Sequence, residues 1–186
     1  MKKVLMTKQE VKTLSYCTGL IIILSLWIIL RTEGLSDINL LMSGSLILFG
    51  YVATVFDINK KIIPNMLVLI MFGVWILLTV PLLFVDFTTG TRIMTESLYG
   101  FLIGGGLFLL VYFISSKGLG GGDVKFMAIS GLYLGFSGTI SSILYGTILA
   151  ALTGLFLIMI KKIKRKDSIP LAPFLFIGIL ITFFTS

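Results

Sequence analysis

The chain contains no histidine and a single cysteine, Cys17. Without histidine, Ser-His-Asp and Cys-His nucleophile systems, H-E-x-x-H metalloproteases and His-ligated redox metals are excluded. One cysteine excludes a disulfide or a Cys-type zinc site within one chain. The side chains left for catalysis are carboxylates, lysine, serine, threonine and tyrosine.

Charged residues are also scarce. They make up 12% of the 186 residues, compared with about 25% in an ordinary soluble domain, whereas 57% of the residues are hydrophobic. Apolar runs of a length that can cross a bilayer recur along the chain. The composition therefore predicts an all-α, polytopic membrane protein. The net charge of +7 does not indicate nucleic-acid binding, because the basic residues lie between hydrophobic runs.

We expect about seven transmembrane helices, or six if the short fifth run is only a half-helix. A basic tail, an anchor helix and a short outer loop would form residues 1–37, and a membrane domain residues 38–186. The anchor is expected to stay uncleaved, because Arg31-Thr-Glu-Gly follows it instead of a small-residue cleavage site. The expected spans are approximately 14–30, 38–56, 66–85, 96–114, 124–134, 139–160 and 174–186.

Several connections can also be predicted. Pro64 should end one helical stretch and Asn65 should cap the next. Residues 86–95 are expected to form a polar loop, and Gly135-Phe-Ser-Gly138 a turn. The triplet Gly104-Gly-Gly106 should permit either close helix approach or a kink.

The basic residues predict the orientation of the chain. With seven spans and a cytoplasmic N-terminus, all 15 Lys and Arg residues except Arg31 and Arg92 fall on the inner side. Asp57 then ends a span at the cytoplasmic face, and Asp123 begins another span at the same face. The lysine-rich loop at 161–166 is explained as a topology signal with affinity for anionic lipid.

Each of these two acids has a structural explanation. Asp57 has Lys60 and Lys61 at helical ion-pair spacing, and Asp123 stands at a helix start, where a carboxylate accepts backbone N–H bonds. Considered as a pair, the two acids fit aspartyl-protease chemistry. Two close carboxylates cannot both ionise, so they share a proton; one then activates a water while the other polarises the scissile carbonyl. The glycines before Asp123 would let a peptide backbone come close.

Three ordered segments resemble the landmarks of the type IV prepilin peptidases. They are Asp57 followed by Ile63-Pro-Asn65, then Gly120-Gly-Gly-Asp-Val-Lys125, then Ile169-Pro-Leu-Ala-Pro-Phe-Leu175. The resemblance extends from about residue 45 to the C-terminus. It implies a membrane aspartyl endopeptidase that cuts the leader of prepilin-like proteins at the cytoplasmic membrane face. No metal or organic cofactor is implied.

The resemblance also assigns residues. Asp57 and Asp123 match the catalytic aspartates, while Gly120, Gly122 and Lys125 match motif positions expected to bind substrate. From the residues alone, Lys125 can either act on Asp123 or face lipid headgroups. Longer family members carry paired Cys-x-x-Cys motifs and also N-methylate the product. The absence of these Cys-x-x-Cys motifs from this chain favours a peptidase-only short form, similar to enzymes of tight-adherence pili or archaeal flagellins.

Other functions remain as alternatives. A small transporter or channel could use the same two acids for cations or protons, although such proteins usually show internal symmetry and acids near the midplane. A non-catalytic membrane scaffold would leave the glycine segment unexplained. Presenilin-like proteases share the Gly-x-Gly-Asp motif, but the Ile-Pro segments fit the prepilin group better.

Overall fold

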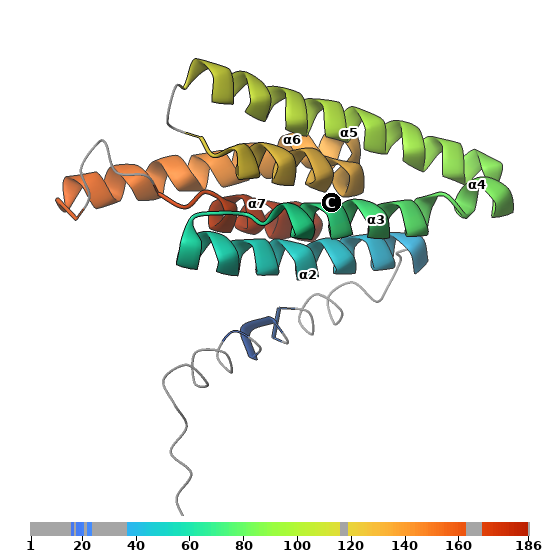
Figure 1. Cartoon of the computed structure of the whole chain (residues 1–186), viewed down its shortest axis with the longest axis horizontal. Helices are drawn as coiled ribbons and strands as arrows, with labels where there is room; N and C mark the ends of the chain where they lie inside the picture. The colour runs from blue at the N-terminus through green and yellow to red at the C-terminus, as the bar shows by residue number, and fades with distance from the viewer. Residues whose placement is uncertain are drawn as a thin grey trace, which may run out of the picture.

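The computed structural model in Figure 1 describes residues 16, 18–20, 22–23, 37–115, 119–162 and 169–185. Four helical stretches within this part are long and apolar enough to cross a membrane. The all-α, polytopic class is therefore confirmed. Most of the predicted anchor span, 14–30, and most of the basic loop at 161–168 lie outside the described residues. The elements are α2 (Asp37–Lys60), α3 (Asn65–Thr79), α4 (Leu82–Val85), α5 (Phe87–Ile114), α6 (Gly121–Met159) and α7 (Ala172–Thr185).

The predicted fifth and sixth spans are the two halves of α6, which meet at Gly135. This residue has φ 67° and ψ −171°, a backbone conformation adopted almost only by glycine. Figure 1 shows the second half running back alongside the first. The predicted four-residue turn at 135–138 is thus too long, because helix resumes directly after Gly135. Glu96 of α5 stabilises the start of the second half of α6, because its Oε2 accepts a hydrogen bond from the Phe136 N–H (3.4 Å).

The first half of α6 lies in contact with the backbone of α5. A Cβ atom on Gly100 would overlap the carbonyl oxygen of Gly131, and one on Gly104 would come within 2.5 Å of the Met127 oxygen. Small residues allow this kind of close approach between membrane helices. The expectation for the glycine triplet is confirmed as close approach, and α5 continues through it as one helix.

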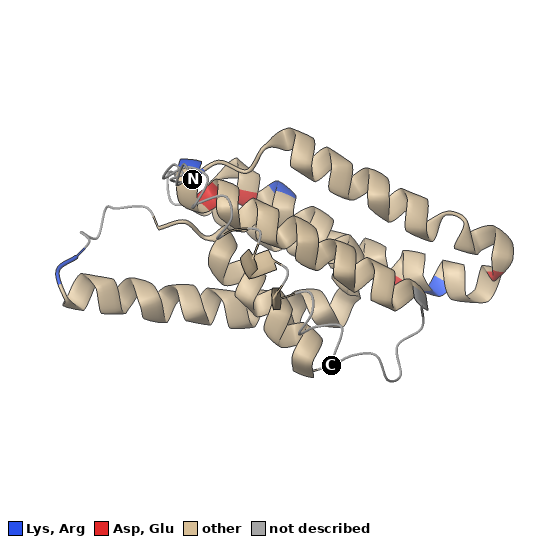
Figure 2. Ribbon diagram, turned by 90° about the horizontal axis from the view of Figure 1, so that it is seen from below, with Lys and Arg blue, Asp and Glu red and all other residues tan. Residues whose placement is uncertain are grey.

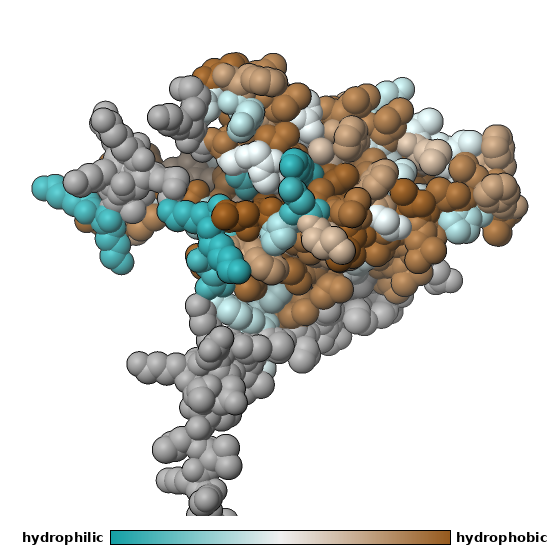
Figure 3. Space-filling view, viewed as in Figure 1, coloured by the Kyte–Doolittle hydropathy of each residue, from teal (hydrophilic) through white to brown (hydrophobic). Residues whose placement is uncertain are grey.

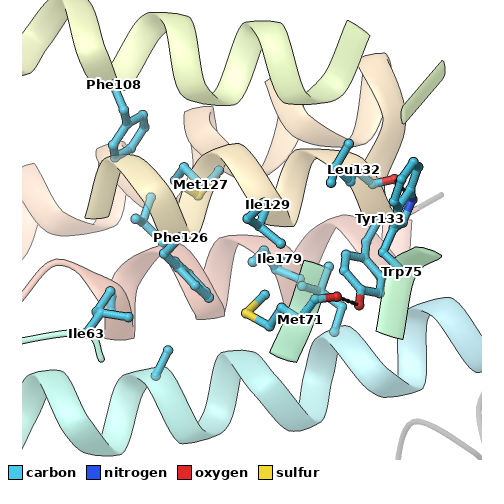
Figure 4. Close-up of a cluster of buried hydrophobic side chains, with 14 of the residues drawn as sticks. Ile63, Met71, Trp75, Phe108, Phe126, Met127, Ile129, Leu132, Tyr133 and Ile179 are labelled. Carbon is cyan, nitrogen blue, oxygen red and sulfur yellow. Dashed lines mark hydrogen bonds between the residues drawn. The ribbon is translucent and has the colours of Figure 1, made fainter. Parts of the chain in front are cut away.

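The hydrophobic core surrounds that same half-helix. Every residue from Phe126 to Tyr133 is buried. Figure 4 shows Phe126, Ile129 and Tyr133 of this segment extending toward Met71 of α3 and Ile179 of α7. Two polar side chains in this core bond to backbone carbonyl groups of a neighbouring helix, whereas the buried Ser130 hydroxyl has no hydrogen-bond partner among the described residues. The Tyr133 hydroxyl donates to the Met71 carbonyl (2.6 Å), and the Trp75 indole N–H donates to the Leu132 carbonyl (3.1 Å). Buried polar groups without such partners would be costly in an apolar surrounding.

The predicted polar loop at 86–95 is wrong, because α5 begins at Phe87. Asp86 acts as its N-cap, with Oδ1 accepting from the N–H groups of Thr88 and Thr89 at 3.1 Å each. Hydrogen bonds from the Thr88 and Thr89 side chains, together with these backbone bonds, lower the pKa of Asp86 to about 2. Farther along the helix, the Thr95 hydroxyl donates to the Thr91 carbonyl (3.0 Å). Local capping and side-chain bonding therefore allow a polar sequence to be helical.

The predicted third span, about 66–85, agrees with one membrane-length stretch, Asn65–Val85, in which the helix is divided in two. Helix α3 ends at Thr79, and the short α4 starts after Pro81. Proline has no N–H to continue a helical hydrogen-bond ladder, which accounts for a break at this point.

Charged residues lie toward the two ends of the molecule. Figure 1 places the end of α2, the start of α3, the end of α5 and the start of α6 at one end. Figure 2 shows acidic and basic positions toward both ends, with uncharged ribbon between them. On the face seen in Figure 3, most of the surface is hydrophobic, and the most hydrophilic residues gather toward the end that contains the α2–α3 loop. That this end faces the cytoplasm stays a prediction.

We expect Gly135→Ala to lower the free energy of unfolding by about 1–3 kcal/mol, because alanine is strained in this backbone conformation. Gly73→Ala is the matched control, since a Cβ atom there would meet nothing within 4 Å. Its stability should equal or exceed that of the wild type. Thermal unfolding followed by circular dichroism in detergent measures both. Equal stability of the two variants would contradict the importance of this reversal.

Candidate active site

A cavity of about 400 Å³ lies between the α2–α3 loop and the start of α6. Its wall contains all five residues that the sequence singled out, although these come from segments more than 60 positions apart. The structure thus brings the predicted site residues together, while their chemical roles stay predictions. The lining residues are Asp57, Lys61, Ile62, Ile63, Pro64, Asn65, Gly120, Gly121, Gly122, Asp123 and Lys125.

Asp57 lies in the last turn of α2 and is 5% exposed. Its Oδ2 accepts a hydrogen bond from the Ala172 N–H at 2.9 Å. Ala172 is the first residue of α7, where backbone N–H groups have no partner within their own helix. Because the positive end of a helix dipole favours a carboxylate, the start of α7 stabilises and orients Asp57. Lys61 also interacts electrostatically with this carboxylate.

Asp123 lies in the first turn of α6. Its Oδ2 accepts a hydrogen bond from the Gly120 N–H (3.2 Å), three residues earlier. The structural explanation for this acid therefore holds, because it does bind its own helix start. Asp123 also lies close enough to Asp57 for the two carboxylates to interact electrostatically. Capping and a shared site are thus compatible at this residue.

The glycines before Asp123 differ in what they contact. A Cβ atom on Gly122 would lie 3.2 Å from the Ile63 Cβ, and one on Gly120 would lie 3.1 Å from the Asp123 Oδ2. At Gly121 a Cβ atom would meet nothing within 4 Å. Gly122 therefore permits close packing against the α2–α3 loop, and Gly121 leaves the cavity open.

Lys125 forms a bond that the sequence did not indicate. Its Nζ donates to the side-chain Oδ1 of Asn65 at 2.9 Å. The expected helix cap by Asn65 is wrong, because Asn65 is the first residue of α3 and Pro64 occupies the capping position without a side-chain bond. The Asn65 oxygen instead links α3 to the first turn of α6.

Two parts of this arrangement were missed by reasoning from the sequence. The Ala172 N–H partner of Asp57 is 115 positions away, and the Lys125–Asn65 bond joins residues 60 positions apart. A local signal existed for the first, since Pro170 and Pro173 flank a helix start. No local pattern indicated the second.

The geometry fits water activation between two acids. Two carboxyl groups bordering one cavity can hold one proton between them and contact one water molecule. Among the described residues, no group of three or more His, Cys, Asp and Glu side chains could hold a metal ion.

An apolar groove of about 430 Å³ lies next to the cavity and shares Lys125 with it. It extends between α3 and α5, over the first half of α6. Gly106 borders the groove, and a Cβ atom there would meet nothing within 4 Å. Intramolecular packing therefore does not require glycine at this position.

The fold and cavity define a class: a polytopic membrane protein with a pair of carboxylates at one end of its helices. The model of the type IV leader peptidase family matches residues 44–155, and the chain belongs to this family. It is 26% identical over 138 residues to the prepilin leader peptidase/N-methyltransferase of Bacillus subtilis (strain 168). The match covers 71% of this chain and 50% of the relative, so the chain spans about half the length of that protein. No solved structure matches.

The Ala172–Asp57 bond gives a test that does not depend on activity. We expect Asp57→Ala to be less stable than Asp57→Asn by about 1–3 kcal/mol, because alanine leaves the Ala172 N–H without an acceptor. Both variants remove the charge, so their difference isolates the acceptor. Thermal unfolding in detergent measures it, and equal stabilities would exclude this bond as an anchor of Asp57.

Proposed function

We propose that this protein is a membrane aspartyl endopeptidase that removes the leader peptide of type IV prepilin-like proteins. The observation that supports this most is that Asp57 and Asp123 border one cavity and interact electrostatically. Membership of the leader peptidase family supports the substrate class.

In the proposed mechanism, the two carboxyl groups hold a water and one proton. The ionised acid takes a proton from the water while the oxygen of this water attacks the scissile carbonyl carbon. The protonated acid donates its hydrogen bond to the carbonyl oxygen and stabilises the developing oxyanion. Collapse of the tetrahedral intermediate breaks the C–N bond, and the amine product leaves with a proton from the acid pair.

The glycine segment would admit the substrate. An extended peptide can approach a cavity wall closely where that wall has no side chains. Gly121 provides such a position, because the space beside it is unoccupied. We place the cut at the cytoplasmic face, because the cavity lies at the end of the molecule that carries Lys60, Lys61 and Lys125. The location of the acids at helix ends favours hydrolysis over ion transport, for which a site near the midplane is typical.

The proposal covers the peptidase step alone. The similar protein of Bacillus subtilis is also named an N-methyltransferase. The single cysteine of this chain cannot form paired Cys-x-x-Cys motifs, which were the basis for expecting methylation in longer family members.

We expect Asp57→Asn and Asp123→Asn each to abolish cleavage while leaving membrane insertion intact, since either change removes a member of the acid pair. Asp86→Asn is the control, because it removes an acid from the opposite end and retains a good helix cap. Purified protein in liposomes is incubated with a prepilin, and the products are mapped by mass spectrometry. Cleavage that survives in either site variant removes that residue from the mechanism.

The apolar groove suggests where the apolar segment of a substrate next to the cut would lie. Small residues in a groove give little additional packing with lipid tails, whereas they allow a second helix to pack closely. We expect Gly106→Phe to raise KM for a full-length prepilin by about tenfold and to affect a short leader peptide much less. Gly73→Phe is the control, because Gly73 is equally open but lies outside the groove. Equal effects of Gly106→Phe on both substrates would exclude the groove.

A further inference from the structure

The two aspartates are held by different parts of the molecule. Asp57 is bonded to the start of α7, and Asp123 is bonded to the start of its own helix. Both bonds orient a carboxyl group, yet neither joins the loop after α2 directly to the start of α6. Direct contacts between these two segments are therefore the part of the structure nearest to both acids that can adjust their separation.

Such contacts are present between residues 63–65 and the start of α6. Ile63, which is 5% exposed, packs against Gly122, where a Cβ atom would lie 3.2 Å from the Ile63 Cβ. Two residues after Ile63, Asn65 Oδ1 accepts the bond from Lys125 Nζ at 2.9 Å. The first contact is apolar and has no preferred direction, whereas a hydrogen bond to an ionised donor is short and directional.

We propose that Lys125 and Asn65 form a positioning contact that sets the separation of Asp57 and Asp123. The role of these two residues in catalysis rests on the proposed function. Lys125 lies two residues after Asp123, and Asn65 is the first residue of α3, directly after the short loop that follows α2. Their bond thus connects the backbone segments that carry the two acids.

The loop between Asp57 and Asn65 can transmit this constraint. The Lys61 N–H donates to the Asp57 carbonyl at 2.8 Å, and Pro64 has restricted backbone torsions, here φ −64° and ψ 134°. A change at Asn65 is therefore passed along a short, constrained segment instead of a flexible one. A misplacement of reacting groups by about 1 Å can reduce a rate about a hundredfold.

The proposal gives Lys125 a different role from the substrate binding that its motif position implied. A substrate-binding lysine contributes mainly to KM, and its effect does not depend on Asn65. A positioning lysine contributes mainly to kcat, because it acts through the geometry of the acids. Its effect should also disappear once Asn65 has been replaced.

The test compares Lys125→Met, Asn65→Ala and their double variant in the liposome cleavage assay. We expect each single variant to lower kcat by about tenfold or more, with KM changed by less than about threefold, and the double variant to be no worse than the singles. Lys125→Arg should retain much of kcat, because arginine can still donate to Asn65. Lys162→Met is the control for loss of a positive charge at the same end outside the cavity.

A higher KM with unchanged kcat in Lys125→Met, or normal activity in Asn65→Ala, would overturn the proposal. So would additive effects in the double variant, because independent roles predict additivity.

A second measurement does not use cleavage at all. Ile62 from the loop after α2 and Gly121 from the start of α6 both line the cavity, so Ile62→Cys and Gly121→Cys can be joined by a short bifunctional thiol reagent in a Cys17→Ser background. We expect Lys125→Met and Asn65→Ala each to slow this cross-linking severalfold, while Lys162→Met leaves it unchanged. Unchanged rates in all variants would overturn the positioning contact. Slower cross-linking in a protein that cleaves no prepilin would retain the contact and reject the proposed function.

Discussion

Close backbone contact around the first half of α6 is the constraint on which the arrangement of the site depends. This segment is only 14 residues long before Gly135, and residues 126–133 within it are buried. Gly100 of α5 meets Gly131, and the reversal at Gly135 lets the second half return alongside it. Since Asp123 lies in the first turn of the same half-helix, its position is fixed by packing that occurs one to three turns away.

Asp57 depends on a different kind of contact. The carboxylate would be costly to bury alone, and the start of α7 supplies the N–H that offsets part of this cost. Helix α7 in turn contacts the second half of α6 so closely that a Cβ atom on Gly178 would overlap the Ser142 carbonyl oxygen. Both aspartates are therefore connected to α6, one directly and the other through α7.

The sequence predicted what depends on composition and short motifs. The apolar runs indicate an all-α membrane protein, and the family resemblance alone assigns Asp57, Asp123 and the glycine segment to one site. The wrong predictions concern local structure, where the hydrogen bonds of single side chains decide whether a segment is a helix or a loop. Residues 86–95 looked like a loop because they are polar, yet the side chain of Asp86 caps a helix there. Long-range bonds such as Lys125–Asn65 leave no periodic signal, so only the folded structure could reveal them.

The structural and the catalytic explanations of the two acids support each other. In each carboxyl group, Oδ2 accepts a hydrogen bond from a backbone N–H, and the Leu171 backbone also interacts with the Asp57 carboxyl group. A carboxyl group has a second oxygen that can still exchange a proton or contact a water. Anchoring by backbone groups requires no further titratable residue, which suits a chain without histidine. The ends of helices offer such N–H groups next to the aqueous phase. A water-dependent reaction on a membrane-bound substrate is therefore best placed where apolar helices begin and end.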